Sequence, residues 1–284
     1  DILIVAGKGH EKIQEYKKIK KLFSDQIQIL KNITIKNKTL SSNHKLNILK
    51  ELSNSNNVSS KLKINTASIN SKEIKKDNIF FAIRGKNKDG NLYIKEAFNN
   101  GASLAIVNNK KKSNKRIIVK DTLKFLTEAS SILRENLSSK IISITGSCGK
   151  TSLKELTGKC LNKISQTTYS PKSFNNKFGV PLSLFNLRKN DDFGIFEIGM
   201  DKKGEIDYLS KIIKPDVGVI TNISYAHIKN FENINQIALA KSEIIKNIKD
   251  DGYLVLNKDD EFYNFHKKIG LKRNLKILSF SLKN

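Results

Sequence analysis

The sequence predicts an α/β protein with mostly parallel sheets, arranged as a small first unit and a larger second unit. Short apolar runs of strand length alternate with segments of helical period along residues 61–138 and again along residues 139–284. Strands that alternate with helices favour parallel sheets covered on both faces. A glycine turn between a strand and a helix opens the second unit and is typical of an anion site. With 284 residues, of which 38% are apolar, the chain can bury cores for about two domains.

Residues 1–60 predict little regular structure. The chain begins within an apolar run, Ile2–Val5, which leads into Ala6-Gly7-Lys8-Gly9-His10-Glu11. An opening in the middle of a strand suggests a fragment. Residues 12–35 combine lysine clusters with a weak helical pattern. Residues 36–60 are rich in Asn, Ser and Lys, include a short candidate helix at His44–Leu52, and are interpreted as a linker into the first unit.

The first unit, residues 61–138, alternates predicted strands and helices. A polar glycine loop, Arg84–Gly90, follows its first strand and either holds a ligand or only reverses the chain, and Gly101 ends its first helix. The predicted strands are Ile79–Ile83, Leu104–Val107 and Ile117–Val119, and the predicted helices are Tyr93–Asn99 and Leu123–Leu137.

The second unit, residues 139–284, continues the alternation. Its predicted strands are Ile141–Ile144, Phe193–Ile198, Val217–Thr221, Tyr253–Leu256 and Leu275–Phe280. Helices are predicted after Gly149, at Glu205–Ile213 and from Ile234. The helix after Gly149 carries one apolar face made of Leu153, Leu156, Cys160, Leu161 and Ile164.

The glycine turn of the second unit predicts a phosphate-binding loop. Backbone N–H groups of such a turn face an anion, and the start of the following helix adds its partial positive charge. The common loop reads G-x-x-x-x-G-K-[ST], whereas this chain has the tighter T-G-x-x-G-K-T. The alternative is an ordinary turn with a solvated lysine, and the flanking strand and helix favour the phosphate. We expect Lys150 to reach the outer phosphates, Thr151 to bind Mg²⁺, and a nucleotide to contact Gly146, Ser147, Cys148, Gly149, Lys150 and Thr151.

Two further strand ends carry candidate functional groups. Glu197 lies at the end of the strand Phe193–Ile198, and the carboxyl ends of parallel strands are where α/β proteins place ligand groups. A carboxylate beside Thr151 would complete a Mg²⁺ site of oxygen ligands, whereas the alternative is a glutamate in water. Asn222 and His227 follow the strand Val217–Thr221, and a histidine at this place is a candidate functional group although a lone histidine is usually structural.

Lys241 falls in the middle of an apolar helix face. On a helix from Ile234, that face is formed by Ile234, Ile237, Ala238, Ile245 and Ile248. An inward lysine is costly unless its charge is paired or removed. It either runs along the face to reach water, or it is paired or altered at an active site. A neutral amine can react with CO₂ to give a carbamate, which would convert a cation into an anion that binds metal.

The segment Asn257-Lys258-Asp259-Asp260 follows another strand end. It contacts a nucleotide base or forms a plain Asx turn, and spacing does not choose between the two.

Composition excludes some classes of function. The formal charge of +25 raises the possibility of nucleic-acid binding, but only five of the 52 basic residues are arginine. Base readout and bidentate phosphate contacts favour arginine, and the lysines are spread along the whole chain. No apolar run approaches the length of a membrane span. The two cysteines, Cys148 and Cys160, build no disulfide framework, which is typical of a cytoplasmic protein.

In these motifs the chain resembles the Mur ligases, the ATP-dependent amide ligases of peptidoglycan synthesis, over roughly residues 40–284. The family's phosphate loop, E-x-G magnesium site, N-x-x-x-x-H stretch and A-K-x-E-I stretch are similar to Thr145–Thr151, Glu197–Gly199, Asn222 with His227, and Ala240–Ile244. The resemblance implies two Mg²⁺ ions held by Thr151, Glu197, His227 and a carbamoylated Lys241. It also implies catalytic roles for Lys150, Glu197, His227 and Lys241, and nucleotide contacts from Asn222, Asn257 and Asp260.

Within the family, the closest resemblance is to the ligase that adds D-alanyl-D-alanine to UDP-N-acetylmuramoyl-tripeptide. The shared motifs are Lys154-Glu155-Leu156, Phe174–Pro181 and Gly204-Glu205-Ile206. The first unit would then bind the UDP-sugar. The implied substrate contacts are Ser71, Lys72, Asn175 and Asn176, although Asn70-Ser71-Lys72 stands where the family usually has Asp-[Ser/Thr]-Arg.

Residues 1–35 resemble instead the C-terminal tail of the preceding ligase of the pathway, through Ala6–Glu11 and Phe23-Ser24-Asp25. The sequence is therefore interpreted as an internal piece of a fusion of two ligases. We expect a cytoplasmic monomer that binds ATP but ligates poorly, because the family's third domain would follow Asn284. The alternatives are a folylpolyglutamate synthase-like ligase, which lacks a uridine domain, and a basic nucleic-acid-binding protein.

Overall fold

The computed structural model describes residues 44–282, except for 56, 86, 110, 112 and 226–229, together with the backbone of a short hairpin near the N-terminus. The hairpin pairs β1 (Ile13–Tyr16) with β2 (Ile19–Leu22) in antiparallel fashion. These strands lie where the sequence shows a weak helical pattern, which is wrong for residues 13–16 and 19–22. The predictions for the rest of residues 1–43 fall outside the described part of the chain.

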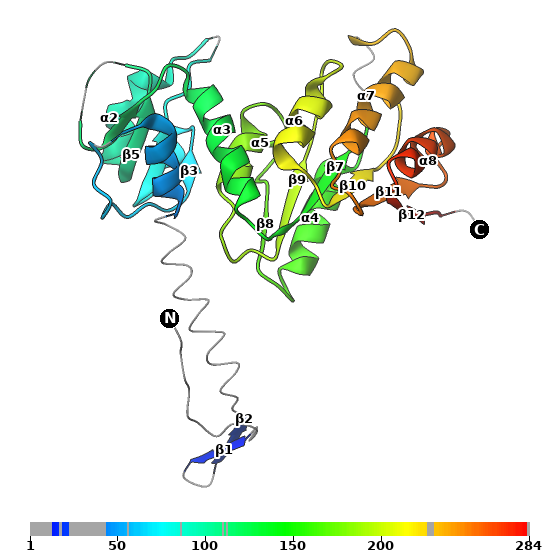
Figure 1. The fold of residues 1–284 in the computed structure, drawn as a ribbon, viewed down its shortest axis with the longest axis horizontal. Coiled ribbons are helices and arrows are strands. Elements are labelled where there is room, and N and C mark those ends of the chain that lie inside the picture. Colours follow the sequence, from blue (N-terminus) through cyan, green and yellow to red (C-terminus); the bar gives the residue numbers. More distant parts are fainter. Residues whose placement is uncertain are drawn as a thin grey trace.

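The first unit is a parallel four-stranded sheet with helices on both faces (Figure 1). Along β4 (Asn78–Phe81), successive side chains point to opposite faces of the sheet. Ile79 and Phe81 pack with the helix over residues 44–53 and with α3 (Thr122–Glu135), whereas Phe80 packs with α2 (Ile94–Asn99). The strand order is β3 (Ala67–Ser68), β4 (Asn78–Phe81), β5 (Ala102–Val107), β6 (Arg116–Ile118), and the helical segments are η1 (Ser71–Glu73), η2 (Gly90–Tyr93), α2 (Ile94–Asn99) and α3 (Thr122–Glu135).

The second unit is a parallel sheet of six strands in the order β12-β11-β10-β7-β9-β8. The predicted α/β class with parallel sheets is confirmed. The strands are β7 (Lys140–Thr145), β8 (Thr167–Tyr169), β9 (Phe193–Glu197), β10 (Val217–Ile220), β11 (Tyr253–Asn257) and β12 (Lys276–Phe280). The helices are α4 (Lys150–Leu161), α5 (Gly179–Phe185), α6 (Glu205–Ile213), α7 (Ile234–Lys246) and α8 (Tyr263–Lys272).

Helix α4 packs on the sheet through only part of the apolar face that the sequence indicates: Leu153 and Leu161 pack against apolar side chains of β7, β9 and β10. Leu156 and Ile164 are 63% and 81% exposed, and Cys160 is exposed as well, whereas Lys154 and Gly158 are buried. The reason is local packing: a Cβ at Gly158 would lie 2.5 Å from the ring of Tyr169, so only glycine lets α4 approach β8 this closely. Lys154 fits beneath the helix because its ammonium donates to the carbonyl of Lys172 and pairs with Glu155.

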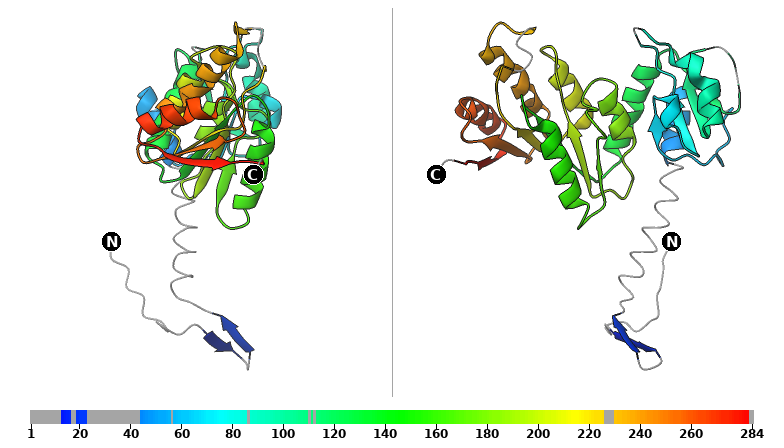
Figure 2. Two further views of the ribbon diagram at one scale, coloured as in Figure 1. Left: turned by 90° about the vertical axis from the view of Figure 1, so that its right-hand side faces the viewer. Right: turned by 180° about the vertical axis from the view of Figure 1, so that it is seen from behind.

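The two units share one hydrophobic core. The ring of Phe81 from the first sheet meets that of Phe185 from α5 edge to face, with centroids 5.5 Å apart. The side-chain amide of Asn186 pairs with the backbone of Ala67, accepting from its N–H at 2.6 Å and donating to its carbonyl at 2.9 Å. Helix α3 lies between the sheets in Figure 1 and in the right-hand view of Figure 2. These contacts fix the first unit against the second.

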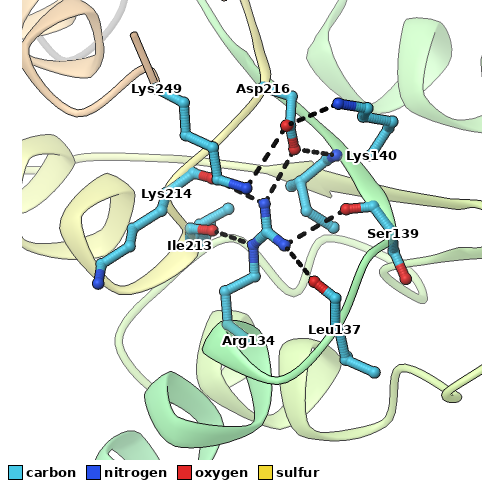
Figure 3. A network of polar contacts seen from close by, with 9 residues as sticks. Arg134, Leu137, Ser139, Lys140, Ile213, Lys214, Asp216 and Lys249 are labelled. Atoms are coloured by element: carbon cyan, nitrogen blue, oxygen red, sulfur yellow. Dashed lines mark hydrogen bonds and ion pairs between the residues drawn. The ribbon is translucent and has the colours of Figure 1, made fainter.

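Arg134, near the end of α3, anchors the amino ends of the central strands (Figure 3). Its buried guanidinium donates to the carboxylate of Asp216 at 2.9 Å, and that carboxylate also accepts from the N–H of Ile141. Figure 3 shows the ring of acceptors around it, which also includes the carbonyl oxygens of Leu137, Ser139, Ile213 and Lys214. The functional groups described next lie at the other end of these strands.

Within the part of the chain that the structure describes, no helix combines the length and the apolar character needed to cross a membrane.

Candidate active site

The phosphate-binding loop connects β7 to α4 at the carboxyl edge of the sheet. Gly146 and Gly149 adopt φ values of +143° and +78°, which favour glycine. A Cβ at Gly146 would also lie 1.9 Å from Oγ1 of Thr221, at the end of the neighbouring strand β10. The loop can therefore pass this close to β10 only with glycine at position 146.

The exit of β10 holds the loop in place. Asn222 accepts the N–H of Cys148 through its side chain and the N–H of Ser147 through its carbonyl, both at 2.9 Å. Thr221 Oγ1 donates to the carbonyl of Cys148 at 2.6 Å. Asn222, predicted to contact the nucleotide, thus touches the loop itself. His227, predicted to bind metal, lies outside the described residues.

Lys150 lies along the loop that it is predicted to serve. Its ammonium donates to the carbonyl of Gly146 at 2.8 Å and to that of Ser147 at 3.2 Å. A bound phosphate could replace these carbonyls as the acceptor for the Lys150 ammonium. Its negative charge would make the hydrogen bonds stronger.

A hydroxyl, a carboxylate and an amide meet beside the loop. Thr151 Oγ1 donates to one oxygen of Glu197 at 2.7 Å, and Asn175 Nδ2 donates to the other at 2.8 Å. Glu197 is only 1% exposed at the end of β9. A carboxylate and a hydroxyl in contact are hard oxygen ligands of the kind that Mg²⁺ prefers, so the donor set fits that ion. Among the described residues no group of three or more His, Cys, Asp or Glu side chains is placed to hold a metal ion.

Lys241 points inward from α7, as its place on the apolar face predicts. Its side chain is 2% exposed and its ammonium donates to the carbonyl of Gly146 at 2.9 Å. Burial, and to a smaller extent the charge of Lys150, lower the pKa of Lys241 to about 7, although Cys148 opposes the shift. The two lysines therefore share one carbonyl oxygen, and a fraction of Lys241 is a neutral amine at neutral pH.

The predicted base-contacting stretch forms a turn at the end of β11. The side chain of Asn257 accepts the N–H of Asp259 at 3.0 Å, which is the Asx turn considered from the sequence. Asp260 accepts the N–H of Ile223 at 2.7 Å and that of Phe262 at 2.9 Å. It thereby ties the exit of β10 to the start of α8.

A cleft of about 770 Å³ opens beside the metal candidate. Its lining includes Lys150, Glu197 and Asn175, together with residues 200–205 at the start of α6. Asn176 also lines the cleft, and its side chain caps α5 by accepting the N–H groups of Phe178 and Gly179 at 3.0 Å each. The cleft is large enough for a substrate.

A second hollow of about 420 Å³ continues the cleft into the first unit, because Leu123, Lys177 and Phe178 line both. Its cationic lining consists of Arg84, Lys120 and Lys177. The loop that starts at Arg84 thus borders a cavity, which the sequence left open. The predicted substrate contacts Ser71 and Lys72 do not line either hollow: Ser71 is buried and donates to Glu96 at 2.8 Å, while Lys72 is exposed in η1.

The comparison with known families agrees with this arrangement. The model of the Mur ligase middle domain matches residues 144–284, and that of the Mur ligase family catalytic domain matches residues 63–134. The chain belongs to the Mur ligase family. The two matches coincide with the two sheets. The match to the middle domain begins within β7, immediately before the glycine loop.

Among curated Mur ligases, the UDP-N-acetylmuramoyl-tripeptide–D-alanyl-D-alanine ligase of Rickettsia prowazekii is 36% identical over 78% of this chain and 49% of its own length. The ligase of the same name from Bacillus subtilis is 31% identical over 69% of this chain and 44% of its own length. This chain therefore spans about half the length of the curated relatives that it matches.

Solved structures of Mur ligases show the same fold. A crystal structure of MurF from Acinetobacter baumannii gives a TM-score of 0.71 at 30% identity, covering 82% of this chain and 52% of that one. MurF of Thermotoga maritima in complex with ADP gives a TM-score of 0.65 at 31% identity, covering 78% of this chain and 51% of that one.

Proposed function

We propose that the chain provides the ATP-binding and substrate-binding part of a ligase that adds D-alanyl-D-alanine to UDP-N-acetylmuramoyl-tripeptide in the cytoplasm. The observation that carries the proposal is the convergence of Thr151 and Glu197 at 2.7 Å with Lys150 and Lys241 on the carbonyl of Gly146. The curated relatives bear the name of this reaction, and one related structure is described as a complex with ADP.

The loop side chains would serve the nucleotide in this proposal. Lys150 exchanges its two carbonyl partners for phosphate oxygens, and the N-terminus of α4 adds its dipole. Thr151 and Glu197 would hold Mg²⁺, which when bound neutralises charge on the phosphates. The peptide carboxylate attacks the terminal phosphorus and ADP leaves. The amine of the dipeptide then attacks the acyl carbon, phosphate leaves, and the amine gives up a proton.

Lys241 would act as a carbamate. Its neutral amine forms a bond to the carbon of CO₂ and releases one proton, which leaves a carboxylate on the side chain and one N–H on the nitrogen. The N–H retains the donor for the carbonyl of Gly146. The lowered pKa, about 7, supports the reaction because it supplies the unprotonated amine. The new carboxylate would contribute a metal ligand in a cluster where Glu197 is otherwise the anion.

The cleft and the cationic hollow would hold the two ends of the other substrate. The reacting carboxylate must lie next to Lys150 and Glu197, so the peptide occupies the cleft. The hollow lined by Arg84, Lys120 and Lys177 offers positive charge to the diphosphate of the UDP-sugar. This placement favours the hollow over Ser71 and Lys72 for that contact.

Calorimetric titration with a non-hydrolysable ATP analogue tests the nucleotide site. We expect Mg²⁺-dependent binding that falls by at least about tenfold in Lys150→Ala and in Thr151→Val, because each loses a charged or metal contact. Lys159→Ala is the matched control, since Lys159 is exposed on the same helix. Equal affinity in Lys150→Ala and Lys159→Ala would contradict the proposal.

A second titration separates the ligase from a nucleic-acid-binding protein. UDP-N-acetylmuramoyl-tripeptide is expected to bind with modest salt dependence, whereas DNA held by surface lysines would lose affinity steeply as salt rises. Tight binding to DNA without binding to the muramoyl nucleotide would overturn the assignment.

A further inference from the structure

Glu243 is a buried carboxylate that the proposed reaction does not use. It is 6% exposed on α7, two residues beyond Lys241. Its two oxygens accept the backbone N–H groups of Gly204 at 2.8 Å and Asp207 at 3.1 Å. Gly204 immediately precedes α6 and Asp207 lies in its first turn, so a side chain from one helix caps the start of another.

The start of α6 needs this cap. Gly204 is the residue before the helix, adopts a φ of +91° and brings no side chain of its own. The first N–H groups of a helix have no partner within it, and a residue with an oxygen-bearing side chain usually provides one. Glu243 supplies both the acceptor and a negative charge at the positive end of the helix dipole.

The capped turn also forms one wall of the substrate cleft. Residues 200–205, here called the rim, line the cleft together with Lys150 and Glu197. Glu205 closes the rim on itself by accepting the N–H groups of Asp201 at 2.6 Å and Lys202 at 3.1 Å. The carboxylate of Glu243 therefore ties the rim to α7 through the N–H of Gly204.

Helix α7 contacts both the glycine turn and the rim. Lys241 points from it to the glycine turn and Glu243 points from it to the rim, so one rigid element sets the distance between them. Asn247 ties the same helices further along, because its amide donates to the side chain of Asp207 at 3.0 Å and to Ser210 at 2.9 Å. The helix pair should therefore stay together when Glu243 is changed.

We propose that Glu243 is a positioning residue that holds the rim at the spacing required for the carboxyl-terminal residue of the peptide substrate. This inference rests on the proposed function, because that function places the reacting carboxylate between the rim and Glu197. The residue acts through the rim and does not itself touch the substrate.

Binding of two muramoyl nucleotides tests the inference. The full tripeptide form reaches the rim, whereas a form that lacks the third residue stops short of it. We expect Glu243→Gln to weaken the tripeptide form by about tenfold, since one charged hydrogen bond is lost, and to leave the shorter form within about twofold. Affinity for the ATP analogue should not change, because the glycine loop keeps all its contacts. Glu51→Gln, at an exposed glutamate of the helix over residues 44–53, is the matched control.

The outcomes separate the two proposals. If the unmodified protein prefers the tripeptide form and Glu243→Gln binds it equally well, the role of Glu243 is wrong and the proposed function stands. If the unmodified protein binds neither muramoyl nucleotide, both proposals fall. Faster amide exchange at Gly204 and Asp207 in Glu243→Gln would be the accompanying physical sign, and unchanged exchange would also count against the cap.

Discussion

Arg134 and Lys241 are both buried cations, and they lie at opposite ends of the strands of the six-stranded sheet. Arg134 is 2% exposed and meets four carbonyl oxygens and the carboxylate of Asp216. Lys241 is equally buried, but its ammonium has one carbonyl partner, and in the described part of the chain it forms no ion pair. Its charged neighbour is Lys150, which repels it.

The difference separates a cation that holds the fold from one suited to chemistry. Burial lowers the pKa of Arg134 too, but Asp216 opposes the shift, and a guanidinium stays protonated in any case. At Lys241 only Cys148 opposes the shift and the pKa still falls to about 7, so its proton is easily lost. A buried cation with a complete set of acceptors indicates structure, whereas a poorly compensated one at the carboxyl end of strands indicates a reactive group.

The largest effect is expected at the structural cation. Arg134→Met should lower the free energy of unfolding by about 3–5 kcal/mol, because four carbonyl groups would lose this donor and Asp216 would lose its buried ion-pair partner. Denaturant titration measures it. Arg188→Met, at an exposed arginine, serves as the control and should change stability by less than about 0.5 kcal/mol. A small effect at Arg134 would mean that water replaces the guanidinium and that the two cations differ less than their contacts suggest.

Lys241→Met should have the opposite sign and depend on pH. The pKa of Lys241 is 10.5 in its ordinary state and about 7 in the fold. Near and below pH 7 this difference therefore lowers the free energy of unfolding by its full amount. Between these values the unfolded chain binds more protons, and the stability of the unmodified protein rises with pH by at most about 1.4 kcal/mol per unit from this group. The variant lacks this term and should be the more stable protein near pH 7, with an advantage that shrinks toward pH 10.

The difference in unfolding free energy between the two proteins, followed from pH 7 to pH 9.5, checks this expectation. Lys45, whose pKa burial also lowers to about 7, is present in both proteins and cancels from the difference. A difference that does not vary with pH would show that the ammonium of Lys241 keeps its usual affinity for protons.

The smallest effect is expected at the edge of the Arg134 network. Lys249 is 44% exposed and its ammonium lies 3.5 Å from Asp216. Lys249→Met should change the free energy of unfolding by less than about 0.5 kcal/mol, because exposed ion pairs gain little over hydration. Thermal unfolding at low and high salt measures the change. A loss comparable with that of Arg134→Met would show that Asp216 needs all of its cations.

The sequence was sufficient where one element determines its own surroundings. The inward direction of Lys241 follows from helical period, and the strand ends that carry Glu197 and Asn222 follow from apolar runs, because both signals are local. Helix α4 shows the limit: its buried face depends on the ring of Tyr169 meeting Gly158, a contact between elements that periodicity does not register. The segments β8, α5 and α8 were not predicted, since β8 is very short, α5 contains Pro181 and α8 is rich in lysine.

The site itself was only partly visible in the sequence. Thr151 and Glu197 could be paired because Glu197 ends one strand and Thr151 follows the parallel strand beside it. Asn175 and Glu243 could not be placed in the same way, because each lies in a segment whose partner is set by tertiary packing. A glutamate two residues beyond an inward lysine on a buried helix was the available signal for Glu243.

The meeting of Phe81 with Phe185, and of Ala67 with Asn186, has a practical consequence for anyone who wishes to divide this protein. Each unit contributes one side of the interface between them. Dividing the chain near Leu137 would expose a hydrophobic surface on both pieces, and we expect each piece to aggregate when produced alone. Co-production of the two pieces should let them recombine into a soluble pair.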